Sequence, residues 1–164
     1  MCGIVGFYDK DVKDSGLIKS MLTEIAHRGP DASTFHQFEN LWLGHRRLSI
    51  IDLDTGNQPM FNQKGNLCTV FNGEIYNYKE LRSDLIKKGY QFATHSDTEV
   101  ILNVYDHYRI DSFNLLNGIF AFAIYDLQNN ELILVRDQFG IKPLHYYFHN
   151  GKFIFSSEQK AILK

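Results

Sequence analysis

The chain has 164 residues, of which 44% are hydrophobic and 22% are charged, as in a soluble globular domain. The formal net charge is -2, and Lys and Arg are scattered among Asp and Glu, which excludes a basic stripe for nucleic acid phosphates. Because no apolar run approaches the roughly 20 residues that span a bilayer and no signal sequence opens the chain, we expect one cytoplasmic domain over residues 1–164 that binds no membrane.

Strand and helix patterns follow one another in the first half of the chain. Residues 3–8 form an apolar strand, and Ser15 is the expected N-cap of a helix with the apolar residues Leu17, Ile18, Met21, Leu22 and Ile25. β-Branched and aromatic residues predict further strands over residues 41–45 and 67–71. A second helix follows, with Asn77 as its N-cap, Gly89 as its end, and an apolar face of Tyr78, Leu81, Leu85 and Ile86.

The second half begins with a helix and continues with strands. The helix has the apolar residues Val100, Ile101, Val104, Tyr105 and Tyr108. Strands are predicted over residues 118–126, 131–136, 144–148 and 152–155, separated by turn sequences, and a helical pattern begins within residues 157–164. Because strands come in groups instead of alternating singly with helices, the sequence predicts an antiparallel, layered α+β fold.

Cys2 is the first candidate for chemistry. Small second residues are those after which the initiator Met is normally removed, and removal would make Cys2 the N-terminal residue. A thiol with an unperturbed pKa of about 8.5 is only slightly ionised at pH 7, whereas a free α-amine, with a pKa of about 7.7 to 8.0, can act as its base. The alternative is that Cys2 is a small buried apolar residue, as we expect for Cys68 within its strand. Two cysteines are too few for a disulfide framework and lack metal-site spacing.

The segment Asn72-Gly73-Glu74 follows the strand at residues 67–71 and offers donors for a developing oxyanion. Asn72 has a side-chain NH2, and Gly73 has a backbone N–H that a substrate can approach closely because no Cβ is present. A hairpin turn is the alternative for an Asn-Gly pair. That alternative is weakened because the chain after Glu74 enters a helix and does not return as a strand.

A free amino acid presents a carboxylate and an ammonium group, which a fork-shaped cation and one or two carboxylates recognise. Arg46 and Arg47 lie at a strand end, and either could be the cation. Asp97 opens the third helix, where helix capping is the alternative to substrate contact. Metal-ligand spacing is absent around three histidines for which we expect surface or core packing, namely His27, His45 and His95.

Sequence motifs that follow one another along nearly the whole chain together resemble the class II glutamine amidotransferases, and in particular the glutaminase domains of asparagine synthetases. The segments are residues 1–6 (MCGIVG), 27–31 (HRGPD), 47–52 (RLSIID), 58–60 (QPM), 71–77 (FNGEIYN), 96–100 (SDTEV) and 136–144 (RDQFGIKPL). This resemblance implies an N-terminal nucleophile hydrolase fold, in which two stacked antiparallel sheets lie between helical layers as an αββα sandwich.

The resemblance also implies a role for individual residues. Cys2 would be the nucleophile with its own α-amine as base, and Asn72 with Gly73 would form the oxyanion hole. The implied substrate contacts are Arg47 to the glutamine carboxylate, Asp97 and Glu74 to its ammonium group, and the backbone around Leu48, Ile50 and Ile51 to its side-chain amide. The expected course is thiolate attack, loss of ammonia and hydrolysis of a γ-glutamyl thioester, without a metal or another cofactor in this domain.

The implied partner is a synthetase. Asparagine synthetases continue into an ATP-dependent domain with a Ser-Gly-Gly phosphate loop that this chain lacks, so we expect that domain after residue 164, or on a separate subunit, with ATP and Mg²⁺. Ammonia would reach it through an internal tunnel. Aspartate is one acceptor, and related proteins amidate other carboxylates. Two alternatives stay open: a non-catalytic domain that retains Met1 and binds glutamine or a partner, and the glutaminase half of an enzyme with another acceptor. A homodimer is also left open.

Overall fold

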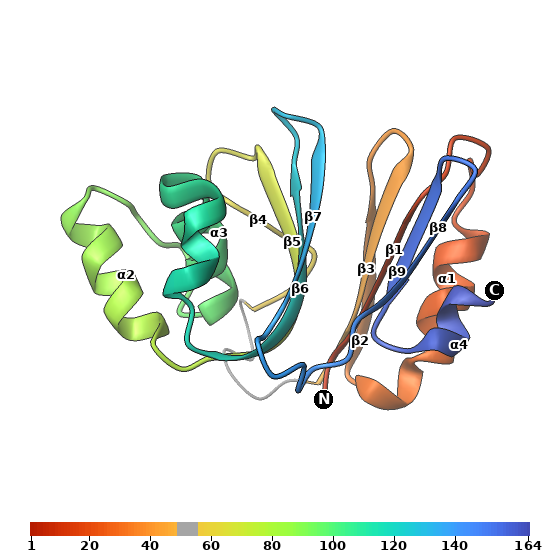
Figure 1. The fold of residues 1–164 in the computed structure, drawn as a ribbon, viewed down its shortest axis with the longest axis horizontal. Helices are drawn as coiled ribbons and strands as arrows, with labels where there is room; N and C mark the ends of the chain where they lie inside the picture. The colour runs from red at the N-terminus through yellow and green to blue at the C-terminus, as the bar shows by residue number, and fades with distance from the viewer. Residues whose placement is uncertain (49–55) are drawn as a thin grey trace.

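The computed structural model describes residues 1–48 and 56–164, and it stacks two sheets face to face (Figure 1). The first sheet has the order β2 (Ala32–Gln37), β3 (Leu41–Arg47), β1 (Gly3–Tyr8), β9 (Lys152–Ser156) and β8 (His145–His149). The second sheet has the order β4 (Met60–Phe61), β5 (Leu67–Ile75), β6 (Gly118–Asp126) and β7 (Glu131–Arg136). The paired strands in both sheets run antiparallel.

Helices cover the outer face of each sheet (Figure 1). The helices α1 (Gly16–Glu24) and α4 (Gln159–Ile162), with the short 3-10 helix η1 (Ala26–Arg28), lie on the first sheet. The helices α2 (Tyr78–Lys87) and α3 (Asp97–Tyr108), followed by the 3-10 helix η2 (Arg109–Leu115), lie on the side of the second sheet. The predicted α+β sandwich of two antiparallel sheets between helical layers is therefore confirmed. None of the helices in the described part of the chain is long and apolar enough to cross a membrane.

Three apolar clusters hold the layers together. Successive side chains of a strand point to opposite faces, so the central strand β1 is apolar on both sides. Val5 packs with Ile18 of α1 on the outer face, and Ile4 packs with Val70 of β5 between the sheets. A third cluster, which includes Ile101, joins α3 to the second sheet. These contacts fix the position of β1, and therefore of Cys2 at its start, against both sheets.

The structure adds two strands that the sequence did not predict. β2 exposes most of its side chains at the edge of the first sheet, so it has no apolar alternation to reveal it. β4 has only two residues, Met60 and Phe61, which is too short for a pattern. The other strands lie where the sequence predicted them, with ends that differ by up to four residues.

β5 is longer than predicted and continues through Asn72-Gly73 to Ile75. These residues therefore lie within a strand, and the hairpin-turn alternative is wrong. Pairing with β6 along the whole length of β5 outweighs the low strand propensity of Asn and Gly. A Cβ on Gly73 would lie 2.1 Å from the carbonyl oxygen of Ile119, so close packing against β6 requires a glycine here.

The helix ends agree with the sequence in position but not in all their hydrogen bonds. Gly89 ends α2 with φ of 92°, and its N–H bonds to the carbonyl of Ile86, as expected for a glycine after a helix. Asn77 occupies the N-cap position of α2 but makes no capping bond, because its side chain donates to the Leu115 carbonyl and accepts from the Asn117 N–H. Ser15 likewise makes no side-chain capping bond for α1.

Candidate functional site

A small cavity of about 90 Å³ lies where β1 begins, at the end of the sandwich that holds the N-terminus in Figure 1. We call this the Cys2 end. The structure brings together here the described residues that the sequence assigned to a site, namely Cys2, Arg47, Leu48, Asn72, Gly73, Glu74 and Asp97. The remaining two, Ile50 and Ile51, lie outside the described residues. Residues next to the start of β1, at the end of β3, within β5 and at the start of α3 therefore line one cavity.

The thiol of Cys2 is half-buried against the backbone of Leu48. The register of β1 with β3 pairs Gly3 with Arg46, which brings the end of β3 beside Cys2. The Leu48 N–H donates to the Cys2 Sγ at 3.3 Å, and the thiol lies 3.5 Å from the Leu48 carbonyl oxygen. Cys68 is fully buried instead, and burial in the apolar layer between the sheets raises its pKa to about 12, as expected for a core residue.

The backbone carbonyl of Cys2 is held by Arg28, whose Nε donates to it at 3.0 Å. Asn72 lies between the same carbonyl, at 3.1 Å, and the Arg28 guanidinium, at 3.3 Å. These neighbours orient the Asn72 amide, with its NH2 toward Cys2 and its oxygen toward Arg28. Glu158 holds the other side of the guanidinium at 3.0 Å. Arg28 lies in the segment at residues 27–31 that carries part of the family resemblance, but no role was predicted for it from the sequence.

The N–H of Gly73 points out of the β5–β6 ladder. In an antiparallel pair, alternate residues direct their N–H and C=O groups to opposite edges of the strand. Phe120, opposite Gly73, has its N–H on the Asp137 carboxylate at 3.2 Å and its carbonyl on the Asp137 N–H at 2.8 Å. Gly73 therefore directs its N–H to the other edge of β5, beyond the end of β4 and beside the cavity. This is the orientation that an oxyanion donor needs.

The two adjacent arginines at the end of β3 point in different directions. Arg47 is buried and lines the cavity, where its guanidinium donates to the Asn57 side chain at 2.8 Å. Arg46 turns to the helical face, where its Nε donates to the Leu22 carbonyl at 2.9 Å. The sequence left both open as a carboxylate-binding cation, and the structure places only Arg47 of this pair at the cavity.

Asp97 and Glu74 bring two carboxylates to the same cavity. The N-cap alternative for Asp97 is wrong, because Ser96 is the N-cap of α3 and accepts from the Thr98 N–H. Asp97 is instead buried, and its carboxylate accepts from the Ile75 N–H at 3.0 Å. Burial, with a contribution from the charge of Glu74, raises the pKa of Asp97 above its ordinary value, although backbone hydrogen bonds lower it. An ammonium group beside the two carboxylates would favour the charged form of Asp97, against the effects of burial and of Glu74.

His45 and Gln58 also line the cavity, although the sequence gave them no functional role. His45 was expected to pack in the core or on the surface, and it is indeed buried. Burial lowers the pKa of His45 to about 4, so the ring is neutral near pH 7. Its Nε2 lies 3.2 Å from the Phe71 carbonyl oxygen, so Nε2 carries the proton and donates it. Nδ1 has no hydrogen-bond partner in the part of the chain that the structure describes.

His27 and His95, for which the sequence likewise predicted packing on the surface or in the core, are exposed. His27 lies 2.9 Å from the Glu158 carboxylate. Among residues 1–48 and 56–164, no group of three or more His, Cys, Asp or Glu side chains could hold a metal ion.

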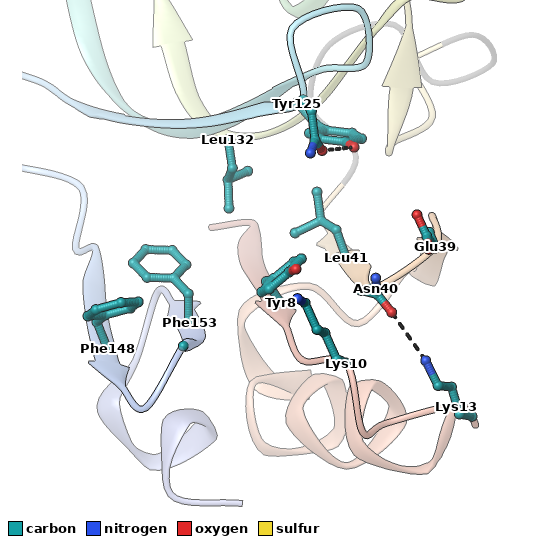
Figure 2. Close-up of a pocket in the computed structure, with 12 residues that line it drawn as sticks. Tyr8, Lys10, Lys13, Glu39, Asn40, Leu41, Tyr125, Leu132, Phe148 and Phe153 are labelled. Atoms are coloured by element: carbon teal, nitrogen blue, oxygen red, sulfur yellow. Dashed lines mark hydrogen bonds between the residues drawn. The ribbon is translucent and has the colours of Figure 1, made fainter.

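A larger cavity, of about 830 Å³, opens at the opposite end of the sheets, which we call the hairpin end (Figure 2). Figure 2 shows Tyr8, Leu41, Leu132, Phe148 and Phe153 around it, with Lys10 and Lys13 at one side. Of the site residues assigned from the sequence that the structure describes, none lines this cavity. The sequence-assigned residues that the structure describes therefore line the smaller of these two cavities.

Comparison with known proteins gives one consistent family. A family model described as a glutamine amidotransferase domain matches residues 1–164. Asparagine synthetase (glutamine-hydrolyzing) 1 of Bacillus subtilis (strain 168) is 45% identical over 168 residues, which cover 99% of this chain and 27% of that protein. A probable asparagine synthetase (glutamine-hydrolyzing) of Dictyostelium discoideum is 40% identical, over 99% of this chain and 30% of that protein. The chain thus spans less than a third of the length of these relatives.

A solved structure shares the fold. Glutamine phosphoribosylpyrophosphate amidotransferase from B. subtilis, complexed with ADP and GMP, superimposes with a TM-score of 0.82. The match covers 98% of this chain and 43% of that chain at 23% identity. At this identity the likeness concerns the arrangement of sheets and helices, which is the sandwich described above.

Proposed function

The chain belongs to the class II glutamine amidotransferase domains, and on that premise we propose that it hydrolyses glutamine to glutamate and ammonia with Cys2 as nucleophile. The observation that carries the proposal is the arrangement around one sulfur atom. The Leu48 N–H holds the Cys2 thiol, while the Asn72 amide and the outward-pointing Gly73 N–H lie in the same cavity.

The reaction follows from these groups once Met1 is removed. The α-amine of Cys2 takes the thiol proton, and the sulfur attacks the carboxamide carbon of glutamine. Negative charge develops on the carboxamide oxygen, where the Asn72 amide and the Gly73 N–H donate to it. The amine returns the proton to the leaving nitrogen, and ammonia departs as the carbon–nitrogen bond breaks. Water then hydrolyses the thioester to glutamate and restores the thiol.

The substrate would be held by its charged groups. Arg47 suits the α-carboxylate, because a guanidinium offers paired donors to two oxygens. Asp97 and Glu74 suit the α-ammonium group. In this proposal the backbone near Leu48, Ile50 and Ile51 receives the side-chain amide of glutamine.

We propose further that the ammonia passes to a synthetase domain or subunit that uses ATP and Mg²⁺. Support comes from relatives that are asparagine synthetases more than three times as long as this chain. Aspartate is the acceptor that these relatives' names suggest, and the residues at the Cys2 end do not distinguish it from another carboxylate.

The competing function is a non-catalytic glutamine-binding domain. Retention of Met1 would favour this function. The Cys2 nitrogen is then an amide and can accept no proton. Met1 also lines the cavity, and its sulfur lies 3.9 Å from the Arg28 guanidinium.

Controlled exposure of Cys2 tests the proposal. The chain is produced with a leader that a protease removes immediately before Cys2, and intact mass verifies each form. We expect ammonia release from glutamine to rise at least about a thousandfold on cleavage, and Cys2→Ala to abolish it without changing the thermal unfolding midpoint. Equal activity before and after cleavage, or in Cys2→Ala, would exclude the mechanism. Glutamine binding without turnover by the cleaved chain would favour the competing function.

A further inference from the structure

The backbone groups along the outer edge of β5, which faces away from β6, have several kinds of bonding partner. At one residue both partners are side chains. Residues 67, 69, 71, 73 and 75 direct their backbone groups to this edge, as the bond from the Asn62 N–H to the Leu67 carbonyl shows. β4 covers the edge only opposite Cys68 and Thr69. Farther along, the Ile75 N–H bonds to Asp97. Between these points, both backbone groups of Phe71 are bonded by side chains.

Gln58 and His45 supply those two bonds. The Phe71 N–H donates to the Gln58 Oε1 at 2.6 Å, and the His45 Nε2 donates to the Phe71 carbonyl at 3.2 Å. In a sheet, a neighbouring strand would provide both partners: an acceptor for this N–H and a donor for this carbonyl. The two side chains therefore make, at the residue directly before Asn72, the bonds that a longer β4 would make.

Both side chains are themselves fixed. Gln58 is 8% exposed, its Nε2 lies 3.4 Å from the Thr98 hydroxyl, and its backbone carbonyl accepts from the Thr34 hydroxyl. His45 is 1% exposed and belongs to β3, so its bond to Phe71 joins the first sheet to the second. Cys2 directly precedes β1 of the first sheet, whereas Asn72 and Gly73 belong to β5 of the second. The His45 bond therefore links the sheet of the nucleophile to the sheet of the oxyanion donors.

We propose that His45 and Gln58 are positioning residues that fix the Asn72-Gly73 backbone at the distance from Cys2 that oxyanion stabilisation requires. This inference rests on the proposed glutamine hydrolysis. Loss of one oxyanion donor in other enzymes costs about 100-fold to 1000-fold in kcat, and a displacement of about 1 Å can cost about 100-fold. An unsupported edge at Phe71 would permit such a displacement, while Arg47 and Asp97 would still bind the substrate.

The test compares Gln58→Met and His45→Leu with Thr69→Val, in chains that begin at Cys2. Thr69→Val is a matched control, because it removes another buried bond of β5, from the Thr69 hydroxyl to the Ala123 carbonyl at 2.8 Å. We expect Gln58→Met and His45→Leu each to lower kcat for glutamine hydrolysis about 10-fold to 100-fold, with KM changed less than about threefold. Thr69→Val should lower the unfolding midpoint but leave kcat within about twofold.

A second measurement separates positioning from general loss of stability. The aldehyde analogue of glutamine forms a thiohemiacetal with a cysteine thiol, and its oxygen occupies the oxyanion position. We expect its affinity to fall with kcat in the two positioning variants, while the affinity for glutamate is unchanged. Gln58→Glu, which keeps an oxygen opposite the Phe71 N–H, should recover part of the activity that Gln58→Met loses.

The outcomes distinguish this inference from the proposed function. If the parent chain releases ammonia but Gln58→Met and His45→Leu retain full kcat and aldehyde affinity, the positioning role is wrong and the hydrolysis stands. Equal losses of kcat in Thr69→Val would also overturn the positioning role, because any buried bond of β5 would then suffice. If the parent chain itself releases no ammonia, the proposed function fails first.

Discussion

The two ends of the space between the sheets show different ways of building a cavity. At the Cys2 end, the backbone groups of Cys2, Leu48, Phe71 and Ile75 all bond to side chains or to the thiol around a space of about 90 Å³. At the hairpin end, aromatic and aliphatic side chains, together with the exposed charged residues Lys10, Lys13 and Glu39, surround about 830 Å³. The smaller space has the buried charges and the directed donors. The contrast teaches that the smaller cavity, and not the larger one, collects the buried charged side chains and the residues that the family resemblance assigned to a site.

The sharpest test of this contrast between the two ends uses the adjacent arginines of β3. Arg47→Ala should weaken glutamine binding by about 2 to 5 kcal/mol, the range for removing one partner of a buried charge pair. Arg46→Ala removes the same charge one residue away, where the side chain bonds to the Leu22 carbonyl, and should leave binding unchanged. Calorimetry in the Cys2→Ala background measures both. Equal losses would show that net charge, and not the direction of the side chain, determines affinity.

Asp97→Asn gives the next largest expected effect. The variant keeps an oxygen for the Ile75 N–H but loses the charge that would face the substrate ammonium group. We expect binding to weaken by about 1 to 3 kcal/mol at pH 7. Stability should be equal or higher, because burial raises the pKa of Asp97 and so disfavours its charged form in the folded chain.

The pH dependence checks that assignment of Asp97. In the parent chain, glutamine affinity should be full above the raised pKa of Asp97 and should fall as Asp97 is protonated below it. Asp97→Asn should lack this fall in affinity. A parallel pH profile in both chains would place the ammonium-binding charge elsewhere.

The sequence predicted the architecture by two routes. The strand and helix patterns indicated an antiparallel, layered α+β fold, and the resemblance to glutamine amidotransferases implied the αββα sandwich. The same resemblance implied the site residues Cys2, Asn72, Arg47 and Asp97, which line one cavity in the structure. The extension of β5 was missed because Asn and Gly are poor strand formers, and only pairing with β6 reveals it. The contacts of His45, Gln58 and Arg28 were not predicted because these side chains bond to backbone atoms of distant segments. No local pattern reports such contacts between distant residues.

At Glu158 we expect a smaller effect, on the free energy of unfolding. Its pKa falls to about 2 from 4.5: burial alone would raise it, but the hydrogen bonds from Arg28, His27 and Lys160 outweigh burial. A depressed carboxylate pKa stabilises the fold above about pH 4.5, and this contribution is lost as the pH falls toward 2. The Glu158 side chain is 25% exposed, so we expect about 1 to 2 kcal/mol after allowance for solvent screening.

Unfolding of the parent chain and of Glu158→Gln between pH 7 and pH 2.5 measures that contribution. The difference in the free energy of unfolding should shrink steadily below pH 4.5, because Glu158 binds a proton there in the unfolded parent but not in the folded parent, whereas the variant has no titrating group at this position. Asp9 and Asp137 also have lowered pKa values, for which burial is opposed by hydrogen bonds, but they are present in both chains and cancel. A difference that is constant over this range would mean that packing, and not charge, accounts for Glu158.

The smallest effect is expected at the hairpin end, where Lys13 donates to the Asn40 side chain at 3.2 Å on the exposed surface. Lys13→Ala should change the free energy of unfolding by no more than about 0.5 kcal/mol, because exposed polar contacts contribute little. Together with Lys10→Ala it should leave glutamine hydrolysis unchanged, since neither lysine lines the Cys2 cavity. Ammonia release by this double variant, measured beside Arg47→Ala, compares the two ends directly. A comparable loss in both would mean that the large cavity takes part in the reaction, and the assignment of chemistry to the Cys2 end alone would then be wrong.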